Sequence, residues 1–208
     1  LGYGASDSCS LPRPLGYMQH EALEVLPELL RVAGVRECIL IGHSDGGSIA
    51  LIYAGSMPAL PLRGVITEAA HLFCEDISVQ SIQKIKALYV RDGELRGKLA
   101  KYHGQNVDCA FWGWNQAWLH PDFREWNIEE YLPHIKVPLL AIQGAEDQYG
   151  TAAQVDAIAS QTGNQTEVLM LPDCGHTPHK EQKEATFDAM VTFIQNILYK
   201  KHLPQLPY

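Results

Sequence analysis

A short apolar run that leads directly into a glycine-rich turn constrains this chain more than any other feature. Cys38–Ile41 has the continuous hydrophobicity of a strand buried on both faces of a parallel sheet. Gly42–Gly47 follows at once as G-H-S-D-G-G, and Ser48–Met57 then has helical character. A strand, a tight turn and a helix in immediate succession are the setting of a nucleophile elbow. The sequence therefore predicts that Ser44 is a nucleophile.

The residues around Ser44 fit the demands of such a turn. Gly42 and Gly46, two positions before and after the serine, are small enough to let the neighbouring backbone pass. The helix that follows has a partial positive charge at its N-terminus, where a developing oxyanion would be stabilised. We expect the main-chain N–H of Asp45 to be one donor to that oxyanion.

Two later strand ends supply an acid and a base. Asp147 follows the apolar run Val137–Ile142, and His176 follows the run Val168–Leu171. The C-terminal ends of parallel strands share one edge of a sheet, where ligands bind in such folds. A serine hydroxyl needs a base to take its proton, and the base needs an acid to orient it. The sequence predicts His176 as that base and Asp147 as that acid.

Alternatives for the acid and the base lie close to both residues. Glu146 is adjacent to Asp147, where a solvated loop carboxylate is the ordinary interpretation. Asp173 is too near His176 in sequence to act as its partner. His179 could be the base, although the start of a helix explains its position better.

Strands alternate with helices along most of the chain, which predicts βαβ units and an α/β fold with helices on both faces of a parallel sheet. The predicted strands are 38–41, 62–67, 137–142 and 168–171. The predicted helices are 17–32, 48–57, 151–161 and 181–198. The last helix presents the apolar residues Phe187, Met190, Val191, Ile194 and Ile197.

One stretch interrupts this alternation. Residues 74–135 contain several helical segments, no good strand pattern and all four tryptophans, Trp112, Trp114, Trp118 and Trp126. We expect this stretch to be a helical cap inserted into a core made of residues 1–73 and 136–200, with a tail at 201–208. The tryptophans could stack on a substrate, but packing within the cap is the more ordinary role of large aromatic side chains.

The charge of the chain bears on its partners. The net charge is −8 and the sequence pI is about 5.5, without runs of Lys and Arg. Nucleic acids require clustered basic residues, so a small-molecule substrate is expected instead. No apolar stretch approaches the roughly 20 residues of a membrane span. We expect no membrane, cofactor or metal, and the oligomeric state is left open.

The cysteines indicate a cellular compartment. There are five of them, an odd number, and no C-x-x-C motif occurs. This pattern predicts free thiols in a reducing, cytoplasmic environment rather than a disulfide framework. No secretory signal is visible, but the sequence begins with Leu1 rather than Met, so a leader upstream stays open.

Taken together, these motifs resemble the α/β-hydrolase superfamily over nearly the whole chain. The matching pieces are G-H-S-D-G-G at Gly42–Gly47, G-x-x-D at Gly144–Asp147 and G-H at Gly175–His176. Gly2–Asp7 looks like the G-Y-G-x-S loop that follows the fourth strand of that family. The resemblance implies a cap-bearing hydrolase similar to small-ester esterases and C–C bond hydrolases. A serine at position 44 does not match the dehalogenase and epoxide-hydrolase branches, which have aspartate there.

The resemblance also implies that the N-terminal part of the fold is missing. The family has four strands and an H-G oxyanion segment before the loop that Gly2–Asp7 resembles. We therefore expect a piece of an enzyme roughly 60 residues longer. In the family topology, the strand Cys38–Ile41 would then be left as a bare, apolar sheet edge.

Three functions fit these residues. The first is hydrolysis of a small carboxylic ester or thioester through an acyl-enzyme intermediate. The second is C–C bond hydrolysis of an aromatic ring-cleavage product. The third is a catalytically impaired fragment or binding protein of the same fold. His43 and His71 are expected to line the pocket, and the substrate is expected to be apolar or aromatic.

Overall fold

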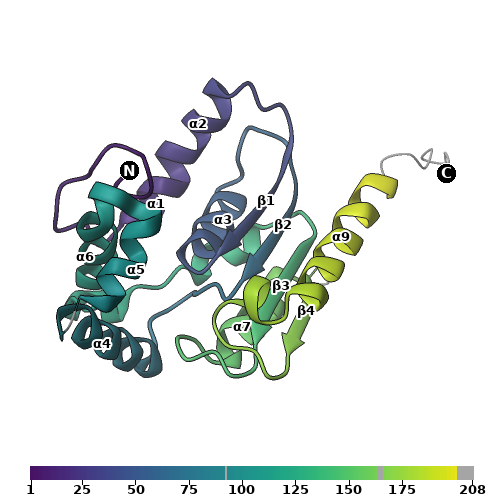
Figure 1. The fold of residues 1–208 in the computed structure, drawn as a ribbon. Coiled ribbons are helices and arrows are strands. Elements are labelled where there is room, and N and C mark those ends of the chain that lie inside the picture. Colours follow the sequence, from purple (N-terminus) through teal and green to yellow (C-terminus); the bar gives the residue numbers. More distant parts are fainter. Residues whose placement is uncertain (92, 164–165, 201–208) are drawn as a thin grey trace, which may run out of the picture. The chain divides into compact units, whose positions relative to one another are not determined.

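A computed structural model describes residues 1–91, 93–163 and 166–200 (Figure 1). It divides into two compact units, Leu1–Tyr17 with Cys74–Trp126, and Met18–Phe73 with the chain from Asn127 onward. The first residues are thus grouped with the segment predicted as a cap, whereas the sequence predicts residues 1–73 as part of the core. The role of 74–135 as a cap stays a prediction, and the predicted tail at 201–208 lies outside the described residues.

A four-stranded parallel sheet organises the second unit. Its strands are β1 (Cys38–His43), β2 (Leu62–Glu68), β3 (Leu139–Gly144) and β4 (Thr166–Leu171), hydrogen-bonded in the order β1-β2-β3-β4. The predicted α/β fold with a parallel sheet is confirmed, with strand ends shifted by up to two residues. Because all four strands run in the same direction, the loops that follow them leave from one edge.

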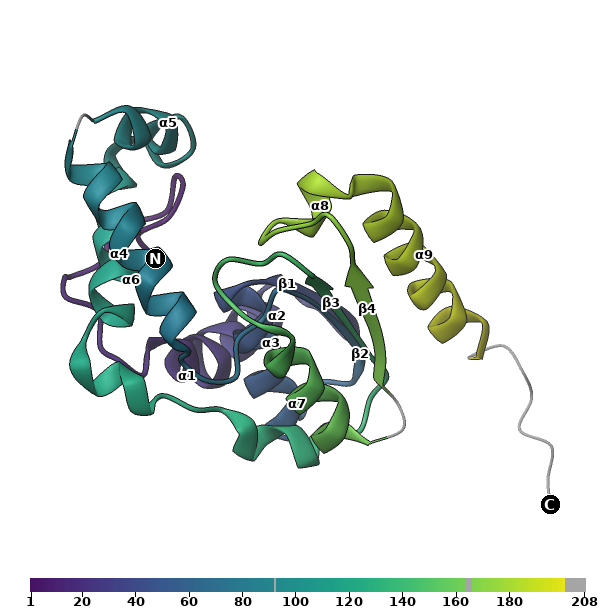
Figure 2. The same cartoon turned by 90° about the horizontal axis from the view of Figure 1, so that it is seen from below.

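Helices cover both faces of this sheet (Figure 2). Helices α3 (Asp45–Gly55) and α7 (Ala152–Thr162) pack on one face, and α9 (Lys183–Lys200) packs on the other. Three shorter elements precede β1, namely α1 (Tyr17–His20), the π-helical η1 (Glu21–Val25) and α2 (Leu26–Val32). The remaining helical turns of the unit are η4 (Glu129–His134) and α8 (Pro178–Glu181).

The core beneath α9 differs in part from the predicted one. Met190, Phe193 and Ile197 are buried against the sheet, whereas Phe187 and Val191 are close to half exposed. Apolar residues occur on more than one side of α9, so their spacing alone could not identify the buried stripe. The i, i+3, i+7 spacing of the buried three is that of one helix face.

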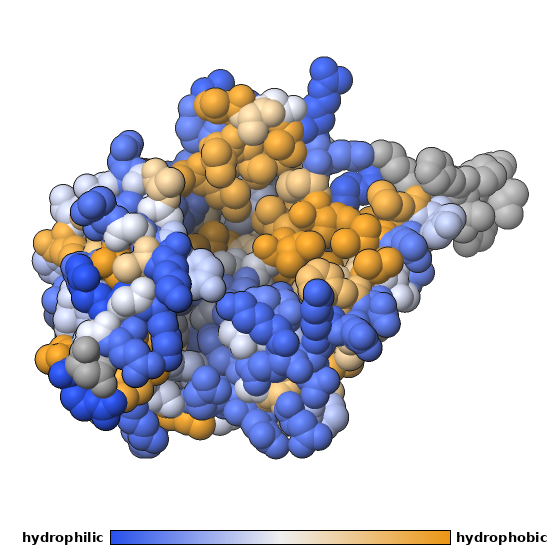
Figure 3. Space-filling view, in the orientation of Figure 1, coloured by the Kyte–Doolittle hydropathy of each residue, from blue (hydrophilic) through white to orange (hydrophobic). Residues whose placement is uncertain are grey.

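The strand that leads to Ser44 lies at an edge of the sheet. Ile41 of β1 is 53% exposed, which corrects the prediction that this run is buried on both faces. Within the described residues, β1 has β2 as its neighbour on one side only. Leu29 and Val32 of α2 are exposed as well, and Figure 3 shows apolar side chains gathered over this part of the surface.

The first unit joins a loop, residues 1–16, to a run of helices between residues 76 and 125. It contains α4 (Asp76–Arg91), α5 (Glu94–His103), η2 (Gly104–Asn106), α6 (Val107–Trp118) and η3 (Pro121–Glu125). Trp118 and Phe123 are buried, and Phe123 stacks on Trp126 with ring centroids 5.2 Å apart. These two tryptophans therefore pack the interior of their own unit. No helix in the described part of the chain is long and apolar enough to cross a membrane.

Candidate active site

Ser44 lies at the sharp turn between β1 and α3. Its φ is 54° and its ψ is −122°, a backbone conformation that residues other than glycine rarely adopt. Holding a residue there costs about 1–3 kcal/mol. A Cβ at Gly42 would overlap the main chain of Gly46, so the turn requires glycine at position 42. A Cβ at Gly46 would meet open space, so the prediction that both glycines make room is correct for Gly42 alone.

The loops after β3 and β4 approach each other closely. A Cβ at Gly144, the last residue of β3, would overlap the carbonyl groups of Cys174 and Gly175. The N–H of Glu146 donates to the carbonyl of Cys174 at 2.9 Å. This close approach brings the loop that contains Asp147 next to the loop that contains His176.

The three residues predicted as nucleophile, acid and base form one hydrogen-bonded chain. Nε2 of His176 lies 3.0 Å from Oγ of Ser44. Nδ1 of His176 lies 2.9 Å from Oδ2 and 3.0 Å from Oδ1 of Asp147. A carboxylate accepts, so Nδ1 carries the proton and the lone pair of Nε2 faces the hydroxyl of Ser44. This is the tautomer that a general base at Ser44 requires.

The carboxylate of Asp147 is buried and held by two further donors. Its side chain is 0% exposed, and that of His176 is 13% exposed. Nε2 of Gln143 donates to Oδ2 and the N–H of Tyr149 donates to Oδ1, both at 2.8 Å. Burial acts to raise the pKa of Asp147, but the contacts with His176, the N–H of Tyr149 and the charge of His71 lower it overall.

Two residues that the sequence did not predict, Gln143 and Tyr149, also contact Asp147. Gln143 is a polar residue at the end of an otherwise apolar strand, four positions before the acid, and that placement is a signal that could have identified it. Tyr149 contributes through its main chain, and its ring centroid lies 4.7 Å from that of His176. Every residue except proline has a main-chain N–H, so a contact of this kind cannot be predicted from the type of the residue.

The alternatives for the acid and the base, Glu146, Asp173 and His179, are either exposed or bonded to another residue. Glu146 and Asp173 are exposed. Nδ1 of His179 lies 3.0 Å from Oε2 of Glu68, so this ring is engaged with a carboxylate of its own. The hydroxyl of Ser44 donates instead to Nε2 of His176.

The two histidines predicted to line the pocket both lie beside His176. Nε2 of His43 lies 2.6 Å from the main-chain carbonyl oxygen of His176. His71 is buried, its Nε2 lies 3.1 Å from the carbonyl oxygen of Tyr149, and its ring centroid lies 5.8 Å from that of His176. Asp45 begins α3 directly after Ser44, as predicted for an oxyanion donor. Contact of these residues with a substrate stays a prediction.

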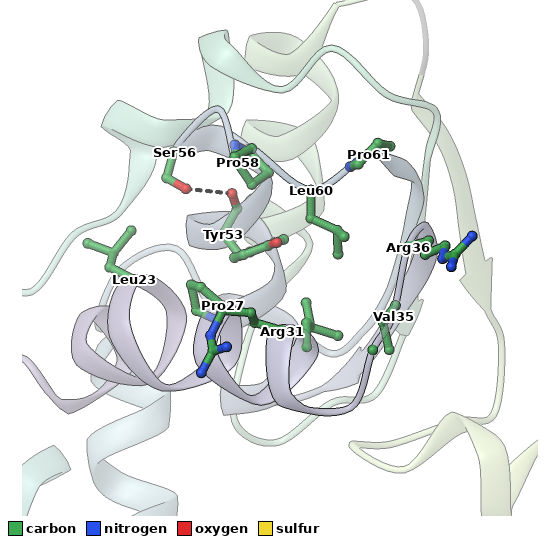
Figure 4. Close-up of a pocket in the computed structure, with 13 residues that line it drawn as sticks. Leu23, Pro27, Arg31, Val35, Arg36, Tyr53, Ser56, Pro58, Leu60 and Pro61 are labelled. Carbon is green, nitrogen blue, oxygen red and sulfur yellow. Dashed lines mark hydrogen bonds between the residues drawn. The ribbon is translucent and has the colours of Figure 1, made fainter.

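A cavity of about 730 Å³ lies elsewhere in the same unit (Figure 4). Its lining comes from η1, α2, the loop Gly34–Arg36, the end of α3 and the segment Pro58–Pro61, and includes Leu23, Pro27, Val35, Tyr53 and Leu60. Ser44, Asp147 and His176 are not among its lining residues. Across the described residues, no group of three or more His, Cys, Asp and Glu side chains is arranged to hold a metal ion.

Comparisons with known proteins identify the family of the chain. A family model described as "Alpha/beta hydrolase family" matches residues 1–189. No curated protein matches the chain.

Solved structures match the fold at low sequence identity. A thermophilic esterase from Thermogutta terrifontis is 20% identical with a TM-score of 0.66, over 94% of this chain and 77% of that one. An esterase from Exiguobacterium antarcticum is 17% identical with a TM-score of 0.70, over 93% and 78%. A meta-cleavage product hydrolase from Pseudomonas fluorescens IP01 is 15% identical with a TM-score of 0.68, over 94% and 77%.

Proposed function

The chain belongs to the alpha/beta hydrolase family, and on that basis we propose that it is a serine hydrolase that cleaves a small carboxylic ester or thioester. The single observation that carries this proposal is the placement of His176 between Ser44 and Asp147, within hydrogen-bond distance of both. In the proposal, Ser44 is the nucleophile, His176 the general base and Asp147 the residue that orients His176.

The first half of the reaction forms an acyl-enzyme. Nε2 of His176 takes the hydroxyl proton of Ser44 as Oγ attacks the carbonyl carbon of the substrate. The carbonyl oxygen becomes an oxyanion, and the main-chain N–H of Asp45 at the start of α3 is the proposed donor to it. The tetrahedral intermediate then collapses, and the leaving alcohol or thiol takes the proton from His176.

The second half releases the acid. Water enters in place of the leaving group and gives a proton to Nε2 of His176 as its oxygen attacks the acyl carbon. Collapse of the second tetrahedral intermediate breaks the bond to Oγ and returns the proton to Ser44. Asp147 stays ionised throughout, in keeping with its lowered pKa, and stabilises the imidazolium.

A burst experiment tests this proposal. Mixing the protein with excess p-nitrophenyl acetate should release close to one equivalent of p-nitrophenolate per chain before steady turnover, because the acyl-enzyme accumulates. Intact-mass analysis of an acid-quenched sample should show one acetyl group, and peptide mapping should place it on Ser44. Acetylation at another residue, or turnover that is unchanged in Ser44→Ala, would contradict the proposal.

Hydrolysis of a C–C bond is the second candidate, and the likeness to a meta-cleavage product hydrolase is the observation that favours it. Both reactions would use the same three residues, so the substrate distinguishes them. The ester proposal predicts a higher kcat/KM for short p-nitrophenyl esters than for a vinylogous diketone made by ring cleavage of a catechol. The reverse order of kcat/KM would favour the second candidate.

A further inference from the structure

A buried carboxylate close to Ser44 takes no part in the proposed reaction. Glu68 is the last residue of β2, and its side chain is 6% exposed. Its main-chain carbonyl accepts from the N–H of Ser44 at 2.8 Å. Its Oε2 accepts from the main-chain N–H of His179 at 2.9 Å and lies 3.0 Å from Nδ1 of the same residue. Glu68 therefore connects the nucleophile turn to the segment that follows the base.

His43 connects the same two segments from β1. It is the register partner of Glu68 across the two strands, and its ring lies edge-on to that of His179 with centroids 5.1 Å apart. Its Nε2 lies 2.6 Å from the carbonyl oxygen of His176. Glu68, His179 and His43 thus form a continuous path that ends on the main chain of the base.

The proton positions in this path follow from the acceptors. The carbonyl oxygen of His176 has no proton to give, so Nε2 of His43 is the donor. The carboxylate of Glu68 likewise requires that Nδ1 of His179 donate. Burial lowers the pKa of His43 overall, although the contact with the carbonyl of His176 and the charge of Glu68 act to raise it. A neutral ring with its proton on Nε2 satisfies that carbonyl.

We propose that Glu68, His179 and His43 are positioning residues that hold the main chain of His176 so that its Nε2 stays at Ser44 Oγ. This inference rests on the proposed function, in which His176 is the base. The path acts on the carbonyl side of His176, whereas Asp147 acts on the ring. The base is therefore fixed at two independent points.

The rest of the loop has a separate anchor, so removal of the path should displace His176 without unfolding the loop. Glu181 accepts from the N–H groups of Gly175 and Thr177 at 2.8 and 2.9 Å, and from the hydroxyl of Thr177 at 2.6 Å. A misplacement of a catalytic group by about 1 Å can cost roughly a hundredfold in rate. The expected loss is in kcat, because the path acts on the position of His176. His43 is also predicted to line the pocket, so KM is measured alongside kcat to report on contact of its ring with the substrate.

Paired variants at His43 test the inference. His43→Leu removes the donor to the carbonyl of His176, and we expect kcat on p-nitrophenyl acetate to fall about 10- to 100-fold with KM within about threefold. His43→Gln puts an amide N–H near the position of Nε2, and kcat should return to within about threefold of the parent. The exposed His134, changed to Leu, is the matched control and should leave kcat and KM unchanged.

A double-mutant cycle tests whether the three residues act as one unit. Glu68→Leu should lower kcat as His43→Leu does, and the double variant should cost far less than the product of the two losses. Losses in kcat that multiply in the double variant would overturn the inference. So would a His43→Leu variant that changes KM alone or leaves kcat unchanged, or a His43→Gln variant whose kcat does not recover.

Two measurements separate this inference from the proposed function. Hydrogen exchange at the amide of His179, which donates to Glu68, should be faster in His43→Leu and Glu68→Leu than in the parent, while the amides of Gly175 and Thr177, held by Glu181, keep their protection and the melting temperature falls by no more than a few degrees. Long-range ¹H–¹⁵N spectra should show His43 protonated at Nε2 and His179 at Nδ1. If these hold while the parent's turnover survives Ser44→Ala, the proposed function fails; unchanged exchange or the opposite tautomers would overturn the positioning inference itself.

Discussion

Nε2 of His176 lies 3.0 Å from Oγ of Ser44, although 132 positions separate the two residues in the sequence. The contact exists because β1 and β4 are parallel strands of one sheet and the loops after them leave from the same edge. Replacing His176 by Ala should therefore lower kcat by about 10⁴- to 10⁶-fold, as loss of the base does in related triads. Steady-state hydrolysis of p-nitrophenyl acetate measures this.

His179→Ala is the matched control for that change. It removes the other histidine of the same loop, and under the positioning inference it should cost no more than about a hundredfold in kcat. If His179→Ala were the more damaging of the two substitutions, the base would be misassigned.

Asp147→Asn should lower kcat by about 10⁴-fold while leaving the fold intact. An amide at this position can donate to Nδ1 of His176 and so favour the tautomer whose proton lies on Nε2, which cannot accept from Ser44. Kinetics together with ¹⁵N spectra of His176 check both parts. Full activity of Asp147→Asn with His176 protonated at Nδ1 would show that Asp147 does not set the tautomer.

The lowered pKa of Asp147 predicts how its contribution to stability varies with pH. The folded pKa lies below the ordinary value of 3.8, so the contribution is fully present above that value. It is lost as the pH falls through the lower, folded pKa. The free energy of unfolding should therefore be higher for the parent than for Asp147→Asn near pH 7, and the difference should shrink below about pH 4. Urea unfolding at a series of pH values tests this; a difference that grows towards low pH would contradict it.

The thiols of Cys9 and Cys109 lie close enough to form a crosslink. Their Sγ atoms are 3.1 Å apart within the first unit, and both thiols are free in the structure. Burial acts to raise the pKa of Cys109, but the N–H and thiol of Cys9 and the charge of Arg13 lower it overall. Mild treatment with hydrogen peroxide should oxidise this pair to a disulfide with loss of two hydrogens. Peptide mapping without reductant detects the product, and its absence, or equal reaction at Cys74, would contradict the expectation.

The region 112–126 is predicted to affect substrate range rather than chemistry. If residues 74–135 act as a cap, exchanging this region should change KM for bulky esters more than it changes acylation by a small activated ester. Parallel kinetics on p-nitrophenyl acetate and a long-chain or aromatic ester measure the contrast. Equal losses on both substrates would show that the region is structural only.

The placement of Ser44, Asp147 and His176 side by side could be predicted because each depends on local patterns. Ser44, Asp147 and His176 each follow an apolar strand in a short loop, and parallel strands bring such loops to one edge. The parallel direction of the strands was enough to predict that these three loops meet at one edge of the sheet. The same reasoning located Asp45 at the start of a helix.

What the sequence could not predict depends on contacts between distant segments. Glu68 and His179 are 111 positions apart, and neither has a residue type or spacing that indicates the other. His43 was expected to line the pocket, and its contact with the carbonyl of His176 involves a main-chain atom that every residue has. Hydrophobicity alone predicted that β1 is buried on both faces. Its place at the edge of the sheet was expected only from the family resemblance, and the exposure of Ile41 agrees with that expectation.

The central claim, that Ser44 is the activated nucleophile, is tested most directly with a fluorophosphonate probe. The probe should label the protein at a single site, peptide mapping should identify that site as Ser44, and Ser44→Ala should abolish the labelling. Labelling should also fall steeply in His176→Ala, because the probe reports on activation of the hydroxyl rather than on substrate turnover. Labelling that survives Ser44→Ala unchanged, or that maps to another serine, would contradict the account.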